Sequence, residues 1–181
     1  MGTRRDRCRW CQAAASRAAY RGRQLFSSLR PRVDPSARDE ALAVLGERER
    51  ALFTRMALRD QQHCLAVYAK LRSQGHDDRD LLAAALLHDA GKGRISLWHR
   101  VAFVMLETSS SRLLDVLASA DGPAWPEVGG WRQALYRCRH HPALGAKLAE
   151  EAGASARTVA LIREDPSSEG LAALHSADEG A

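Results

Sequence analysis

The chain has 181 residues, which is long enough for one domain to bury a hydrophobic core without disulfides. Ala, Leu and Arg dominate, and aromatic residues make up only 6%. No apolar run alternates with a period of two over the length that a sheet would need, so we predict an all-α protein with almost no strand. The longest strongly apolar stretch, residues 101–106, is far short of the roughly 20 residues of a membrane span, which excludes a transmembrane helix there.

The net charge of +5 is concentrated at the N-terminus. Residues 1–32 carry nine arginines and a single acid, Asp6, so they contribute +8 and the rest of the chain sums to −3. A basic segment over residues 1–33 would suit an anionic membrane surface, a nucleic acid or an acidic partner, and it is equally compatible with a disordered tail that binds none of them. Nucleic-acid binding through residues 4–32 would be sensitive to salt.

Two features of the N-terminal segment bear on the cellular compartment. Residues 13–19 are too weakly apolar for a secretory signal, and Arg17 interrupts them, so we expect a cytoplasmic protein. Four cysteines in such a chain predict free thiols rather than a disulfide framework. Cys8 and Cys11 have the spacing of half a zinc site, but no second pair lies nearby.

The first expected elements run from the basic segment to a His-Asp pair. Residues 12–29 can form a basic amphipathic helix that ends before Pro31. Asp34-Pro35 is typical of a helix start and predicts one helix over residues 34–58. Asp60 is expected to cap the next helix, which carries His63 and ends near Gly75, and Asp78 to cap the helix that follows.

The second half of the chain is predicted to form further helices and one long loop. Trp98 is expected in the core of a helix that begins after Ser96, and residues 121–126 form the loop. Because a residue before proline avoids helical geometry, His141 should lie just outside the helix that Pro142 begins. The remaining helices are expected over residues 109–117, 127–140, 143–151, 156–163 and 171–178.

The segment Leu86-Leu87-His88-Asp89-Ala90-Gly91-Lys92 places two polar residues at the end of an apolar helix. A neutral imidazole beside a carboxylate is a pair of ligands for a divalent metal, and Gly91 is expected to supply the helix ending. A second pair, His76-Asp77, lies in a polar turn before a helix, where Asp77 or Asp78 reads as a cap.

The order of His63, His88-Asp89 and Asp178 resembles the H…HD…D pattern of the HD superfamily of metal-dependent phosphohydrolases. The resemblance covers about residues 35–181 and implies an HD-type helical bundle over residues 34–181, with these four side chains as metal ligands. Mixed imidazole and carboxylate ligands suit Mn²⁺, Fe²⁺, Co²⁺ or Zn²⁺, and Mg²⁺ remains open. The implied reaction is hydrolysis of a phosphoester of a nucleotide or related small molecule by a metal-activated water, with Asp89 and Lys92 in catalysis.

A second histidine motif follows at His140-His141-Pro142-Ala143-Leu144-Gly145. It resembles His-Pro-x-x-Gly of the Gly-Tyr-Pro branch of HD domains, so His141 and His140 are candidates for a substrate or a second metal. Residues 161–166 lack the histidines of that branch, and no Gly-Tyr-Pro follows, which argues against cyclic dinucleotide cleavage by its mechanism.

Two points stay open at this stage. Asp178 lies three residues from the C-terminus, and Asp165 is an alternative that fits the pattern less well, while His175 reads as a neighbour or surface residue. A degenerate HD domain that binds a metal or nucleotide as a regulatory module is the alternative function. The sequence does not predict the oligomeric state.

Overall fold

The computed structural model describes residues 35–93, 95–109, 114, 117 and 130–181. Within these residues the protein is all-α and contains no strand, which confirms the predicted fold class. The basic N-terminal segment, with Cys8 and Cys11, lies outside the described residues. The helices are α2 (Pro35–Leu42), α3 (Glu47–Arg55), α4 (Leu58–Ser73), α5 (Arg79–Leu87), the 3₁₀ turn η1 (Ala90–Lys92), α6 (Leu97–Ser109), α8 (Trp131–Glu151), α9 (Ala156–Ile162) and α10 (Leu171–Glu179).

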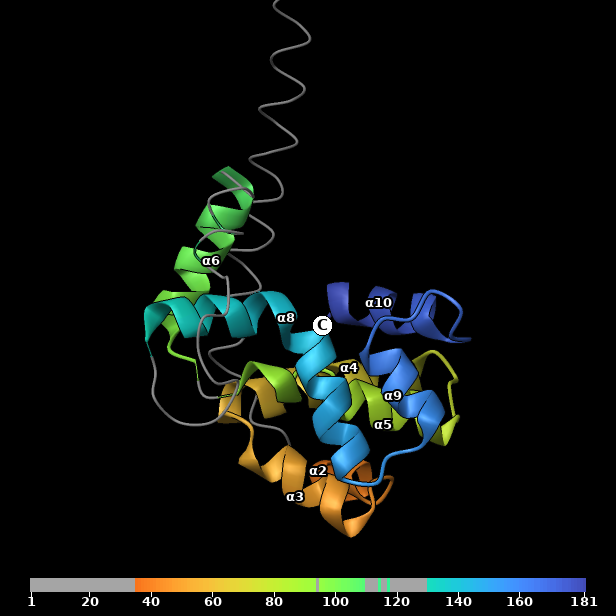
Figure 1. Cartoon of the computed structure of the whole chain (residues 1–181). Helices are drawn as coiled ribbons and strands as arrows, with labels where there is room; N and C mark the ends of the chain where they lie inside the picture. Colours follow the sequence, from red (N-terminus) through yellow and green to blue (C-terminus); the bar gives the residue numbers. More distant parts are fainter. Residues whose placement is uncertain (1–34, 94, 110–113, 115–116, 118–129) are drawn as a thin grey trace, which may run out of the picture.

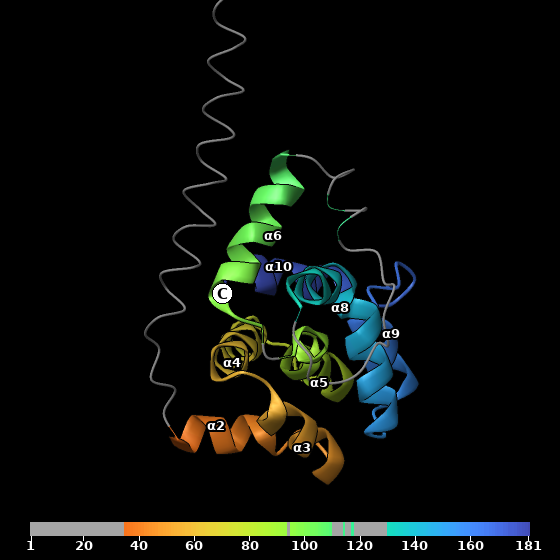
Figure 2. The ribbon, with the colours of Figure 1, turned by 60° about the vertical axis from the view of Figure 1, so that its left-hand side comes forward.

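Helix α5 is the centre of the bundle. Its residues from Leu81 to Leu87 are all buried, because helices α3, α4, α9 and α10 pack around it, with α8 against the adjoining turn η1 (Figure 1). Helix α6 projects away from this body in two views (Figure 2). No helix of the described part of the chain is long and apolar enough to cross a membrane.

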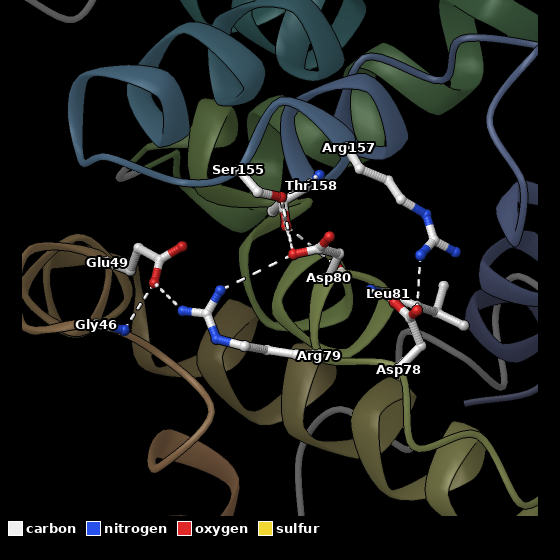
Figure 3. Close-up of polar contacts among 9 residues, drawn as sticks. All are labelled: Gly46, Glu49, Asp78, Arg79, Asp80, Leu81, Ser155, Arg157 and Thr158. Atoms are coloured by element: carbon white, nitrogen blue, oxygen red, sulfur yellow. Dashed lines mark hydrogen bonds and ion pairs between the residues drawn. The ribbon is translucent and has the colours of Figure 1, made fainter.

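The start of α5 is fixed by polar contacts from α9. The Asp78 side chain accepts a hydrogen bond from the Leu81 amide at 2.9 Å, as predicted for a helix cap, and forms an ion pair with Arg157 at 2.6 Å (Figure 3). Asp80 accepts a hydrogen bond from the Ser155 hydroxyl at 2.8 Å. These contacts, together with the packing of neighbouring helices along α5, position the residues that follow its C-terminal end.

The predicted single helix over residues 34–58 is wrong, because it divides into α2 and α3. Gly46 begins α3, and its amide donates to the Glu49 carboxylate at 2.6 Å, which is a backbone-capping contact (Figure 3). Glu49 is buried and lies 3.3 Å from the Arg79 guanidinium. The break therefore lets α3 reach α5.

Three other local expectations are corrected. Asp60 is not a cap but lies inside the first turn of α4, where it is buried and pairs with Arg100 of α6 at 2.5 Å. Trp98 is 81% exposed, because α6 packs through Phe103 and Leu106 instead. The helix break predicted at His141-Pro142 is present one residue earlier, as a kink at His140 that divides α8 into two helical parts, so His141 belongs to the second part and does not lie outside it.

Candidate metal centre

Three ligand atoms from three helices converge at the C-terminal end of α5. Asp178 Oδ1 of α10 lies 2.6 Å from His63 Nε2 of α4 and 3.5 Å from His88 Nε2, which follows α5. The two imidazole rings stand edge to face with centroids 5.4 Å apart. All three ligand atoms lie within 4.8 Å of one another, so two nitrogens and a carboxylate oxygen can contact one divalent ion.

The orientation of His88 follows from the way α5 ends. The last turn of a helix leaves carbonyl oxygens without intrahelical partners, and the Ala85 carbonyl accepts a hydrogen bond from His88 Nδ1 at 2.9 Å. A carbonyl can only accept, so Nδ1 carries a proton, and Nε2 is the ring nitrogen that faces the cluster. This is the usual arrangement of a metal-binding histidine.

His141 is oriented in the same way by the proline beside it. Pro142 has no amide hydrogen, so the Cys138 carbonyl has no helical donor and accepts from His141 Nδ1 at 2.8 Å. His141 Nε2 then lies 4.0 Å from Asp89 Oδ1. Burial, and after it the Lys92 ammonium, lower the pKa of His141 to about 4, which keeps this imidazole neutral at pH 7.

His140 does not join the cluster. It is exposed and lies against the Tyr136 ring, with centroids 4.5 Å apart. The kink falls at this residue, with φ −107° and ψ 15°, and it turns the two neighbouring histidines in different directions. The structure therefore brings one histidine of the pair to the site.

Asp89 is a buried carboxylate beside a buried ammonium. Asp89 is 2% exposed, and its Oδ1 has no hydrogen bond, although Lys92 Nζ lies 2.6 Å away as an ion pair and His88 Nε2 lies 3.4 Å away. Burial alone would raise the pKa of Asp89, but Lys92 and His88 outweigh it and hold the pKa well below its usual value. The buried carboxylate therefore has a positive charge beside it in the Lys92 ammonium, and its environment suits a cation.

Two glycines allow η1 to reach α8. A Cβ atom on Gly91 would lie 2.1 Å from the His141 carbonyl oxygen and 2.6 Å from the Gly145 amide nitrogen. The prediction that Gly91 ends α5 is wrong, because Gly91 lies in η1. There it permits a close contact between the backbones of η1 and α8. Gly93, which directly follows η1, has a positive φ of 63°, a conformation that glycine adopts readily.

The structure places Asp178, and not Asp165, beside the histidines. Asp165 accepts hydrogen bonds from the Ser167 amide at 2.9 Å and its hydroxyl at 2.7 Å, within an exposed turn. Burial opposes the charge of Asp178, but hydrogen bonds from His63 and His88 lower its pKa well below the usual value. The last turn of α10 is packed, since the terminal Ala181 contacts the hydrophobic core.

Cys64 is a neighbour of the cluster that the sequence reasoning did not connect with it. Its Sγ lies 3.7 Å from His88 Nδ1, and Cys64, His88 and Asp89 form a second group with metal-ligand spacing. Burial raises the pKa of the Cys64 thiol, so it stays protonated and is a poor ligand. The sequence feature that could have connected Cys64 with the cluster is its position directly after His63, on the buried side of α4.

A small pocket opens beside the cluster. Its volume is about 50 Å³, and α9 and α10 complete its wall with Leu161, Ile162, Glu164, Leu174 and His175. The sequence reasoning had not assigned the first four of these residues to a site. By contrast, Asp77 of the second His-Asp pair is exposed and pairs with Arg72, away from this pocket.

The described residues thus bring the ligand atoms of His63, His88 and Asp178 within 4.8 Å of one another, whereas Asp89 lies 3.4 Å from His88 but falls in a separate group with His88 and Cys64. Lys92 lies 2.6 Å and His141 4.0 Å from Asp89. His/Asp side chains arranged in this way can bind a divalent metal. Comparisons of the chain with protein-family models, with curated proteins and with solved structures find no match.

Proposed function

We propose that this protein is a metal-dependent phosphohydrolase of the HD type that acts on a small phosphoester such as a nucleotide. The observation that carries the proposal is that two imidazole Nε2 atoms and the Asp178 carboxylate meet at the end of a buried helix, with the Asp89 carboxylate beside them. His63, His88 and Asp178 supply three mutually close ligand atoms, and Asp89 supplies an ionised oxygen 3.4 Å from His88 Nε2. Nothing in the packing of the core requires such a group.

The residues present fit a divalent ion. The hydrogen bond from His88 Nδ1 to a carbonyl directs Nε2 toward the carboxylates, and the buried Asp89 carboxylate is ionised beside a cationic group, the Lys92 ammonium at 2.6 Å. When bound, such an ion lowers the pKa of a water molecule and polarises the oxygens of a phosphoryl group. This is the chemistry that hydrolysis of a phosphoester needs at neutral pH.

Lys92 and His141 extend the site toward the substrate. Lys92 neutralises Asp89 in the free protein and can turn its ammonium toward a phosphate oxygen when a cation takes over that role. His141 is neutral, so it accepts a proton or a hydrogen bond without repelling the ion. A pocket of about 50 Å³ has room for a phosphoryl group and water, so the organic group of the substrate remains at its mouth.

Metal content and hydrolysis together test the proposal. The protein is purified without added metal or chelator, its metals are measured by mass spectrometry, and hydrolysis of p-nitrophenyl phosphate is followed with Mn²⁺. His88→Ala and Asp89→Ala should each lose bound metal and at least about a hundredfold in kcat/KM. The matched control is the double variant His76→Ala/Asp77→Ala, which removes the exposed His-Asp pair and should retain both.

A regulatory binding module is the second candidate, and the contact between Lys92 and Asp89 favours it, because the ammonium already occupies the vicinity of one ligand oxygen. Stoichiometric metal without hydrolysis of any phosphoester would support the module. A folded protein with neither metal nor activity would overturn the hydrolase.

A further inference from the structure

Three described helices end in the same backbone motif, but one of them uses an unusual residue. Helices α4 and α8 end with Gly75 and Gly153 in the left-handed conformation, each with φ 87°. Helix α9 ends with Glu164 at φ 62°, and the amide of Asp165 donates to the Ala160 carbonyl at 3.0 Å, which completes a Schellman motif. Glycine is the usual residue at this position because it has no Cβ atom.

Glu164 is the only non-glycine residue with a positive φ among those that the structure describes. A side chain in this conformation costs stability, so it calls for a compensating role. The two glycine caps lie away from the pocket, whereas Glu164 belongs to its wall. The Glu164 Oε1 atom lies 4.0 Å from His175 Nε2 of α10, which lines the same pocket.

We infer that Glu164 determines substrate specificity, by accepting hydrogen bonds from hydroxyl or amino groups on the organic part of the substrate. This inference rests on the proposed function. The glutamate side chain is 52% exposed, so it is available to a bound molecule at the mouth of the pocket. A second phosphate at this place would meet a negative charge and is disfavoured.

Glu164 lies on the exposed side of a pocket whose interior holds Lys92 together with the carboxylates of Asp89 and Asp178. Lys92 comes from η1 and pairs with Asp89 in the interior, while Glu164 comes from the end of α9 at the rim. With the divalent ion of the proposed function held by His63, His88 and Asp178, a phosphomonoester would place its phosphoryl group inward and its uncharged, hydroxyl-bearing group against Glu164. Hydrogen bonds to a charged acceptor at such a site change affinity by about tenfold or more.

The test compares two esters that differ only in hydroxyl groups, glycerol 3-phosphate and propyl phosphate, with Mn²⁺ present. Wild-type protein should favour glycerol 3-phosphate by about tenfold in kcat/KM, and Glu164→Gln and Glu164→Gly should bring this ratio close to one. Glu164→Gly should also raise Tm by about 2–4 °C, because glycine relieves the backbone conformation. Glu150→Gln removes an exposed glutamate outside the pocket and should keep the wild-type ratio.

The outcomes separate the inference from the proposed function. Hydrolysis of both esters with a ratio that the Glu164 variants leave unchanged overturns the inference and leaves the hydrolase standing. Wild-type protein that hydrolyses p-nitrophenyl phosphate but neither ester overturns the inference alone, and wild-type protein that hydrolyses none of the three overturns both. A more stable Glu164→Gly protein that has lost its preference for glycerol 3-phosphate supports the inference, since a purely structural residue would not give that combination.

Discussion

Replacing Gly91 by alanine tests whether the close contact between η1 and α8 builds the site. The added Cβ atom would lie 2.1 Å from the His141 carbonyl oxygen, and real Cβ contacts do not fall below 3.0 Å. The two backbones must therefore separate by about 1 Å. Neither obstacle is the flexible end of a side chain, since the Gly145 amide nitrogen is also only 2.6 Å away.

This separation should lower both stability and metal affinity. Forcing an extra methyl group into a packed contact between backbones should cost about 3 kcal/mol in the free energy of unfolding, the upper part of the range for overpacking. Because the shift moves His141 and Asp89 relative to each other, we expect metal affinity to fall by about 10–100-fold. Urea denaturation of the metal-free protein measures the first quantity, and calorimetric titration with Mn²⁺ measures the second.

Two further glycines set the scale of the effect. Gly145→Ala should have the same sign and a smaller size, because its nearest contacts would be 3.2–3.4 Å. Gly130→Ala meets nothing within 4 Å and should cost less than about 1 kcal/mol at its helix cap. A Gly91→Ala protein as stable as wild type, with unchanged affinity for Mn²⁺, would refute the reasoning.

Two predictions concern the charges of the site. Lys92→Met leaves Asp89 buried without its ammonium, so the metal-free variant should lose about 3 kcal/mol at pH 7. The depressed pKa of Asp89 contributes stability above its unfolded value of 3.8, so this difference should shrink as urea denaturation is repeated below pH 4. His141 has a folded pKa of about 4 against 6.5 unfolded, so the unfolded chain takes up the proton first as the pH falls. Between pH 7.5 and pH 5, wild type should therefore lose roughly 2 kcal/mol more than His141→Gln, and equal losses would contradict a neutral buried imidazole.

Local sequence signals predicted most of the helices. Asp78 caps α5 as expected, and the helix that was predicted over residues 171–178 is α10. Local signals were insufficient to predict the position of a residue that depends on contacts with another helix. Asp60 has the chemistry of a cap, but the buried ion pair with Arg100 determines its place. Trp98 has the chemistry of a core residue, but α6 has few neighbours to cover it.

By itself the sequence determined the all-α class, the ends of several helices and the candidate ligands His63, His88, Asp89 and Asp178. The fold class and the helix ends follow from periodicity and capping, which act over one or two helical turns, whereas the ligand set follows from the resemblance of the H…HD…D order to a known family. Only the tertiary structure decided that Asp178 rather than Asp165 meets the histidines, that His141 faces Asp89 while His140 does not, and that Glu164 reaches the pocket. The reason is that distances between residues more than a hundred positions apart depend on how helices pack, and contacts such as that of Gly91 with α8 fix this packing.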